Sequence, residues 1–122
     1  MNLGQFSISL AVEDIAVSLE FYRKLGFEQI DGNIAEKWLI LKNGETKLGL
    51  FEGMLQDNLL TFQPDDVRAV QKELKSKGLQ FEHEADESSD HAAHAQAPVF
   101  ASLRDPDGNA ILLDQKFAGY EK

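Results

Sequence analysis

The chain has 122 residues, enough to bury one hydrophobic core but not two independent ones of ordinary size. A composition of 43% hydrophobic and 27% charged residues with only 3 prolines is that of a folded globular protein and excludes a fibrous or disordered class. The formal net charge of −9 repels nucleic-acid phosphates and anionic lipid, so we expect neither as a partner; a neutral or cationic ligand fits better.

Targeting and redox signals are absent from the sequence. No apolar run approaches the ~20 residues that a membrane helix needs, and no secretory leader pattern opens the chain. We therefore expect a cytoplasmic protein. The absence of cysteine excludes disulfides, thiol catalysis and cysteine-ligated metal sites.

The first half of the chain begins with a predicted strand and helix. Residues 6–12 alternate between an apolar face of Phe6, Ile8, Leu10 and Val12 and a small, polar face of Ser7, Ser9 and Ala11. Asp14 is expected to cap a helix that Gly26 ends. The apolar stripe of this helix is predicted to comprise Ile15, Leu19 and Tyr22, widened by Phe21 and Leu25.

Extended segments are predicted to follow that helix. One begins at Phe27, and two more strands cover residues 38–41 and 47–51. The pair Asn43-Gly44 between these last two is a strong signal for a hairpin turn. The expected order of the first half is therefore β-α-β-β-β.

The second half repeats the beginning of this order. A strand over residues 58–63 precedes a breaker at Pro64 and a second capped helix, whose apolar stripe is Val67, Val70 and Leu74. A favourable i,i+4 pair joins Glu73 and Lys77, Gly78 ends the helix, and residues 79–82 are expected to return to strand. Asp14 with Gly26 and Asp66 with Gly78 have the same spacing, which indicates an internal duplication.

The last predicted element is a hairpin over residues 99–103 and 110–114. Its turn, Asp105-Pro106-Asp107-Gly108, combines a residue that bonds its own backbone, a fixed φ and a glycine that tolerates positive φ. The paired carboxylates of this turn, and those of Asp65 and Asp66, stand where caps and turns require them, so we assign them structural roles.

All three histidines, His83, His91 and His94, fall between residues 82 and 98. A connection of this length is either a solvated surface loop or a lid over a site. The sequence leaves both possibilities open.

Together the leading strand, the run Phe21-Tyr22-Arg23-Lys24-Leu25-Gly26-Phe27, the duplication and the late Arg104-Asp105-Pro106-Asp107-Gly108-Asn109 resemble the vicinal oxygen chelate superfamily. That superfamily includes glyoxalases I, extradiol dioxygenases, epimerases, and bleomycin or fosfomycin resistance proteins. The resemblance implies an α+β fold in which two tandem βαβββ modules form a curved mixed sheet around a cleft. It predicts a single glyoxalase-like domain over 1–122, with module one at about 1–54 and module two at about 55–122, and a homodimer.

The resemblance also implies where the superfamily's metal enzymes carry their four ligands. Those positions fall here at Ser7, Gly49, Leu59 and Leu112. None of these residues offers an imidazole or a carboxylate to a divalent cation. The ordinary metal-dependent reactions are therefore not expected.

The same substitutions predict an apolar cleft suited to a small organic molecule. Alternation along the strands nominates its lining, which comprises Ser7, Ser9, Gly49, Phe51, Leu59, Thr61 and Leu112, together with Trp38 and Phe100. The alternative reading is that these apolar side chains belong to the core or to a dimer interface.

Three hypotheses for function follow. The leading one is a binder of a small cationic or aromatic molecule that uses neither metal nor cofactor. The second is a lyase, isomerase or dioxygenase of the same superfamily, with a displaced metal site that includes His91 or His94, completed by Asp90 or Glu87, or with none. The third is a dimerising or regulatory module without a ligand.

Overall fold

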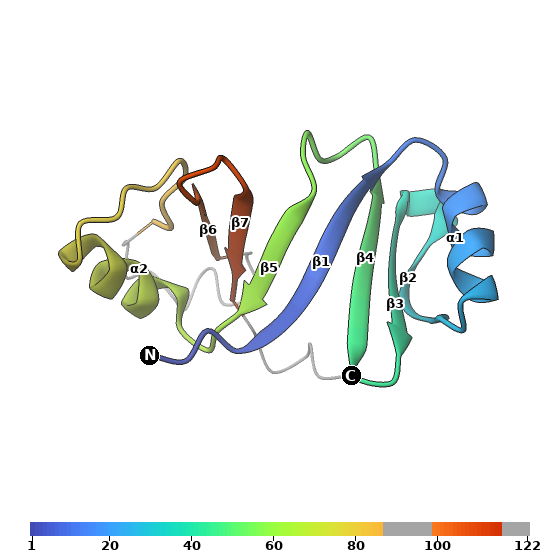
Figure 1. Cartoon of the computed structure of the whole chain (residues 1–122), viewed down its shortest axis with the longest axis horizontal. Coiled ribbons are helices and arrows are strands. Elements are labelled where there is room, and N and C mark those ends of the chain that lie inside the picture. The colour runs from blue at the N-terminus through green and yellow to red at the C-terminus, as the bar shows by residue number, and fades with distance from the viewer. Residues whose placement is uncertain (87–98, 116–122) are drawn as a thin grey trace. The chain divides into compact units, whose positions relative to one another are not determined.

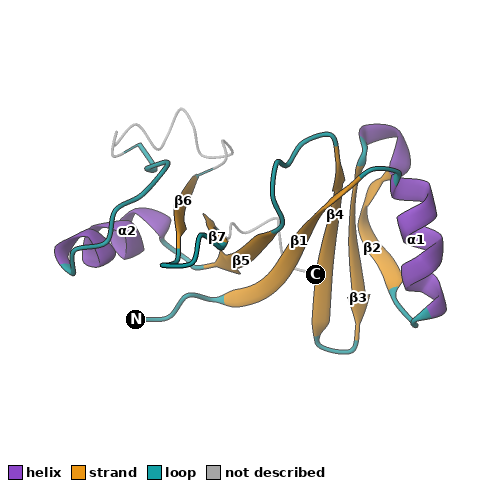
Figure 2. Cartoon of the chain, turned by 45° about the horizontal axis from the view of Figure 1, so that its top comes forward, coloured by secondary structure: helices purple, strands orange, loops and turns teal. Residues whose placement is uncertain are grey.

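A computed structural model describes residues 1–86 and 99–115. The chain divides into two compact units, one formed by residues 7–60 and the other by residues 1–6 with residue 61 onward. Each unit combines strands with one α-helix (Figures 1 and 2). The predicted α+β class is confirmed.

The unit of residues 7–60 contains strands in the order β2-β3-β4-β1 (Figure 1). Their bounds are Gln5–Val12 for β1, Glu28–Asn33 for β2, Trp38–Asn43 for β3 and Thr46–Glu52 for β4. Strands β1 and β4 run parallel, whereas β3 is antiparallel to both β2 and β4, so the sheet is mixed. The predicted hairpin at Asn43 and Gly44 joins β3 to β4, and Gly44 has a φ of 59°.

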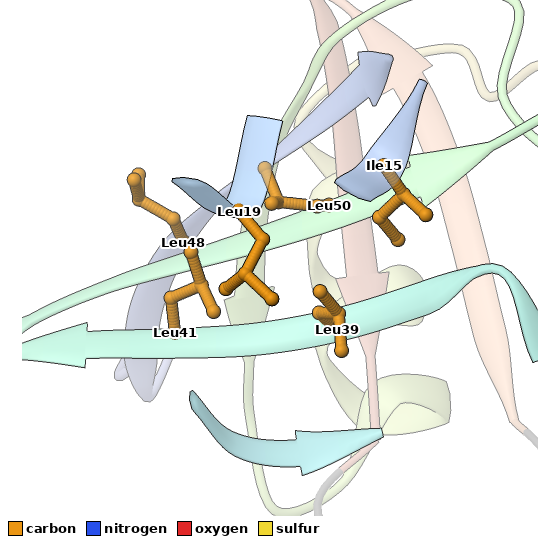
Figure 3. Close-up of a cluster of buried hydrophobic side chains, with 6 residues drawn as sticks. All are labelled: Ile15, Leu19, Leu39, Leu41, Leu48 and Leu50. Carbon is orange, nitrogen blue, oxygen red and sulfur yellow. The ribbon is translucent and has the colours of Figure 1, made fainter. Parts of the chain in front are cut away.

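Helix α1 (Ile15–Lys24) packs against one face of these strands. Its first turn is capped as predicted, because the carboxylate of Asp14 accepts hydrogen bonds from the amides of Ala16 and Val17. Ile15 and Leu19 project from the helix toward four buried leucines of β3 and β4, namely Leu39, Leu41, Leu48 and Leu50 (Figure 3). Gly26 follows the helix with a φ of 100°, which only glycine adopts readily.

The predicted widening of the α1 stripe is wrong. The side chains of Phe21 and Leu25 are 58% and 57% exposed. They share the outer side of the helix with exposed Val17, at intervals of four residues. The helix therefore buries a narrow stripe of Ile15 and Leu19, with Tyr22 partly buried beside it.

The second unit contains the strand order β5-β7-β6 and helix α2. The bounds are Leu59–Gln63 for β5, Val67–Ser76 for α2, Phe100–Arg104 for β6 and Ala110–Asp114 for β7. Asp66 caps α2 through the amide of Ala69, and the predicted pair of Glu73 and Lys77 is present at 3.4 Å. Val67 and Val70 of the helix pack with Leu113 of β7 in a core cluster that also receives the side chain of Leu3.

The predicted strand over residues 79–82 is wrong. The amides of Glu82 and His83 both donate to the carbonyl of Ser102, and His83 forms only an isolated bridge with that residue. Phe81 is partly buried against the core cluster, whereas Leu79 is exposed. Packing of Phe81 against the core cluster, together with the single bridge at His83, therefore replaces the ladder of hydrogen bonds that a strand would form.

Two local contacts fix the ends of this unit. Gly4, with a φ of 78°, lies so close to Gln63 that a Cβ at position 4 would overlap the carbonyl oxygen of Gln63. The side chain of Gln71 is fully buried. Its amide nitrogen donates to the carbonyl oxygen of Ala85 at 3.3 Å, and its amide oxygen accepts from the backbone amide of Ala85 at 2.7 Å.

No helix of the described residues is long and apolar enough to cross a bilayer.

Candidate functional site

The face of the first unit that lies opposite α1 carries the predicted site residues of that unit. Since Leu48 and Leu50 of β4 point into the core with α1, alternation places Gly49 and Phe51 on the other face. Gly49 pairs with Ser9 on one side and with Ile40 on the other. Ser9 is buried and Ser7, two residues earlier, is partly buried.

An aromatic pair follows directly along this face. Trp38 of β3 is the register partner of Phe51 of β4, and both side chains are partly buried. The indole nitrogen of Trp38 donates to the carboxylate of Glu36 at 3.3 Å, which leaves the apolar body of the indole for packing. The ring of Phe51 leans over Gly49, where a Cβ would meet its Cε2 atom at 2.7 Å.

In the second unit, the predicted residues Thr61, Phe100 and Leu112 lie on the face opposite α2. Leu113 and Ile111 pack into the core with α2, so Leu112 is on the other face, paired with Ser102 of β6. Phe100 lies two residues before Ser102 on that same face. Phe62 contacts the core cluster, which places its neighbour Thr61 on the opposite face, where it is buried. Leu59, two residues before Thr61 on β5, is partly buried.

Two residues that we did not nominate from sequence stand beside Phe100. The imidazole of His83 stacks on the ring of Phe100, with centroids 4.3 Å apart and planes 14° apart. Asp114 is the register partner of Phe100 on β7. Burial raises the pKa of the Asp114 carboxyl above its ordinary value.

A sequence signal existed for Asp114 but not for His83. The alternation that placed Leu112 on this face also places Asp114 there, two residues later. The same argument, started from Trp38, would have added Ile40. His83 reaches Phe100 through an irregular segment, so no periodic pattern marks it.

The described residues do not provide the donor set of a metal enzyme. The four positions implied by the resemblance hold a serine, a glycine and two leucines, and within residues 1–86 and 99–115 no cluster of three or more His, Cys, Asp or Glu side chains is arranged to hold an ion. The predicted alternative at His91 and His94, with Asp90 or Glu87, lies outside the described residues.

Two open hollows on the surface lie elsewhere. One, of about 810 Å³, is lined by residues 23 and 26–32, and the other, of about 560 Å³, by residues 2, 4, 5, 63–66, 69 and 70. Neither contains a predicted site residue. Strand β2 supplies residues 28–32 of the first hollow, and the second hollow includes the end of β5 and the first turn of α2. Because neither hollow contains a predicted site residue, we keep one candidate surface on the helix-free face of each unit.

Comparison with known proteins supports the fold. No family model and no curated protein matches the sequence. Among solved structures, a glyoxalase/bleomycin resistance protein/dioxygenase superfamily member from Vibrio splendidus 12B01 is similar at 16% identity and a TM-score of 0.67, over 92% of this chain and 98% of that one. A hypothetical protein from Bacillus halodurans C-125 has 17% identity and a TM-score of 0.69, over 99% of this chain and 98% of that one.

A third similar structure contains a small organic ligand. It is the methylmalonyl-CoA epimerase of Streptomyces coelicolor in complex with 2-nitronate-propionyl-CoA, which is 21% identical with a TM-score of 0.69 over 99% of both chains. At such identities structural similarity establishes the fold and not the chemistry. The chain thus has the fold of the glyoxalase/bleomycin resistance/dioxygenase superfamily, and the resemblance inferred from the sequence is confirmed at that level.

Proposed function

We propose that this protein binds a small organic molecule against the helix-free faces of its strands, without a divalent metal. The observation that carries the proposal is the position of Phe51 over Gly49. At position 49 the resemblance implies a carboxylate ligand, but this chain has a glycine there. The ring of Phe51 occupies the space that a side chain would need. An aromatic surface with nearby serines, Ser7 and Ser9, suits the apolar body of a ligand.

The second unit supports the same proposal. Leu112, where the resemblance implies the superfamily's last metal ligand, lies on a face shared with Phe100 and the hydroxyl-bearing side chains of Ser102 and Thr61. The epimerase from Streptomyces coelicolor is solved with an acyl-CoA analogue, so this fold accommodates small organic ligands. We extend that capacity to the present chain.

Fluorescence of Trp38, the single tryptophan, tests the proposal. Because Trp38 pairs with Phe51, a ligand on this face should shift or quench its emission during titration with a library of aromatic and cationic compounds. Phe51→Ala should weaken the response, whereas Phe21→Ala, which removes an exposed ring from α1, should leave it unchanged. A library without any fluorescence or thermal-shift response overturns the proposal.

Metal analysis separates this proposal from a metal-dependent enzyme. Protein prepared without chelator should contain substoichiometric zinc, nickel, manganese and iron. Stoichiometric metal that is lost in His91→Ala and His94→Ala would favour the displaced site instead. The homodimer that we expect from the resemblance is a separate proposal, which sedimentation equilibrium tests directly.

A further inference from the structure

The carboxylate of Asp114 is half-buried and has no partner among the described residues. No hydrogen bond or ion pair joins it to any group within residues 1–86 and 99–115, and desolvation is the cause of its raised pKa. The next residue, Gln115, points to the other side, since its side chain accepts from the amide of Val67 at 2.9 Å. Asp114 therefore faces the same side as Leu112 and Phe100.

An uncompensated carboxylate is unusual beside an apolar site. A buried or half-buried charge is ordinarily paired, because the lost hydration must be replaced by a partner. The arginine of β6 is engaged elsewhere. Arg104, at the far end of β6, donates to the carboxylate of Glu82 at 2.8 Å and to the carbonyl of Gly108 at 2.9 Å.

The surroundings of Asp114 suit a cation attached to an apolar body. Directly across the strand pair stands the ring of Phe100, and residues paired in this way have Cβ atoms about 4.5–5.5 Å apart. An aromatic ring and a carboxylate at that separation can both contact one organic cation, the ring through its electron-rich face or its apolar edge. The imidazole of His83 stacks on the same ring.

From this arrangement we propose that Asp114 is a ligand-binding residue that pairs with a cationic nitrogen, an ammonium or amidinium group, of an aromatic or apolar ligand held against Phe100. The inference rests on the proposed function and specifies its ligand class. The cation supplies the partner that the carboxylate lacks, and the apolar body of the ligand contacts Phe100 and Leu112. The net charge of −9 favours the approach of such a ligand at low salt.

Two nearly isosteric probes, benzamidinium and neutral benzamide, test the inference. Their affinities are measured by NMR titration of labelled protein, with the side-chain carboxyl carbon of Asp114 followed directly. We expect benzamidinium to bind roughly 3- to 10-fold more tightly than benzamide, as a charge-assisted hydrogen bond in a partly hydrated site allows. The Asp114 signal should shift, and its midpoint of titration should fall when benzamidinium is bound.

Matched variants isolate the carboxylate. Asp114→Asn should reduce the affinity for benzamidinium to that for benzamide, whereas Glu45→Gln, which removes the same charge at an exposed turn, should preserve the preference. Equal affinities in the unmodified protein overturn the inference but leave the proposed function standing. If the Asp114→Asn variant still binds benzamidinium more tightly than benzamide, the inference is also overturned. Binding of neither probe overturns the inference, and the Trp38 titration then decides the proposed function separately.

Discussion

The ring of Phe51 occupies the space above Gly49 that a side chain at position 49 would need. The backbone at Gly49 does not have a positive φ, so the constraint comes from the ring and not from the conformation of the glycine. A glycine here is thus explained by an aromatic neighbour two residues along the same face.

Gly49→Ala should lower the free energy of unfolding by about 1–2 kcal/mol, because the Phe51 ring must turn aside. The same substitution in a Phe51→Ala background should cost close to nothing. Urea unfolding of the four proteins in this cycle measures the coupling. An equal cost in both backgrounds would show that the ring is not the obstacle.

Gly4→Ala should be far more damaging than Gly53→Ala, although the two glycines have φ values of 78° and 77°. At Gly53 a Cβ meets nothing within 4 Å, so only the left-handed strain of about 1 kcal/mol applies. At Gly4 the Cβ would collide with the backbone of Gln63, which adds more than about 2 kcal/mol. Thermal unfolding distinguishes the two, and equal shifts of the midpoint would contradict the contact.

Gln71→Ala should lower the free energy of unfolding by about 2–4 kcal/mol, since both backbone groups of Ala85 then lose a buried partner. The exposed neighbour offers the control, because Lys72→Ala should change stability by less than about 0.5 kcal/mol. Hydrogen exchange at the amide of Ala85 should accelerate in the first variant alone. Slow exchange there despite the substitution would mean that the Gln71 side chain does not protect this amide.

Asp114→Asn should stabilise the protein at pH 7. The folded-state pKa of Asp114 is raised above 3.8, so its contribution to stability is fully present below pH 3.8 and is lost as the pH rises through the folded pKa. Asparagine does not ionise, so the variant does not lose this contribution to stability as the pH rises. The unfolding free energy of the variant should therefore exceed that of the parent at pH 7, and this difference should disappear below pH 3.8. A difference that does not depend on pH would contradict this expectation.

Asp105→Asn should have the opposite pH dependence. The side-chain amide of Asn109 donates to Asp105, as do the backbone amides of Asn109 and Asp107, and these bonds lower the pKa of the Asp105 carboxyl below 3.8. Its contribution is present above pH 3.8 and is lost as the pH falls through the folded pKa. The variant should be less stable than its parent at pH 7, and the gap should close in strong acid. Asp107→Asn is the control, and an identical profile for it would contradict the assignment.

Local chemistry made much of this fold predictable. Asp14 and Asp66 cap their helices, Gly26 and Gly78 follow them with positive φ, and both turns at Asn43-Gly44 and Asp105-Gly108 connect antiparallel strands. These caps and turns are determined by residues that are close together in the sequence, so the sequence alone predicts them. What could not be predicted depends on tertiary contacts: Phe81 packs against the core cluster outside any strand, and Phe21 is exposed instead of widening the buried stripe of α1.

The candidate site was predictable only to the level of a face. Alternation nominated Ser9, Gly49 and Phe51, with Trp38 beside them, but it gave no register between strands. The register pairs are Trp38 with Phe51 and Ser9 with Gly49. Alternation could not show that the Phe51 ring turns back over Gly49, since a rotamer is not a periodic property. It placed Asp114 on the face of Leu112, but it could not show that this carboxylate has no partner within residues 1–86 and 99–115.

The placement of Leu3 in the core cluster of Val67, Val70 and Leu113 has a consequence for synthesis on the ribosome. Residues 7–60 are contiguous and can bury their own leucines as soon as they emerge. Leu3 is synthesised well before its partners Val70 and Leu113, and such long-range contacts form slowly. We therefore expect the segment around Leu3 to remain accessible to chaperones until β7 has been translated.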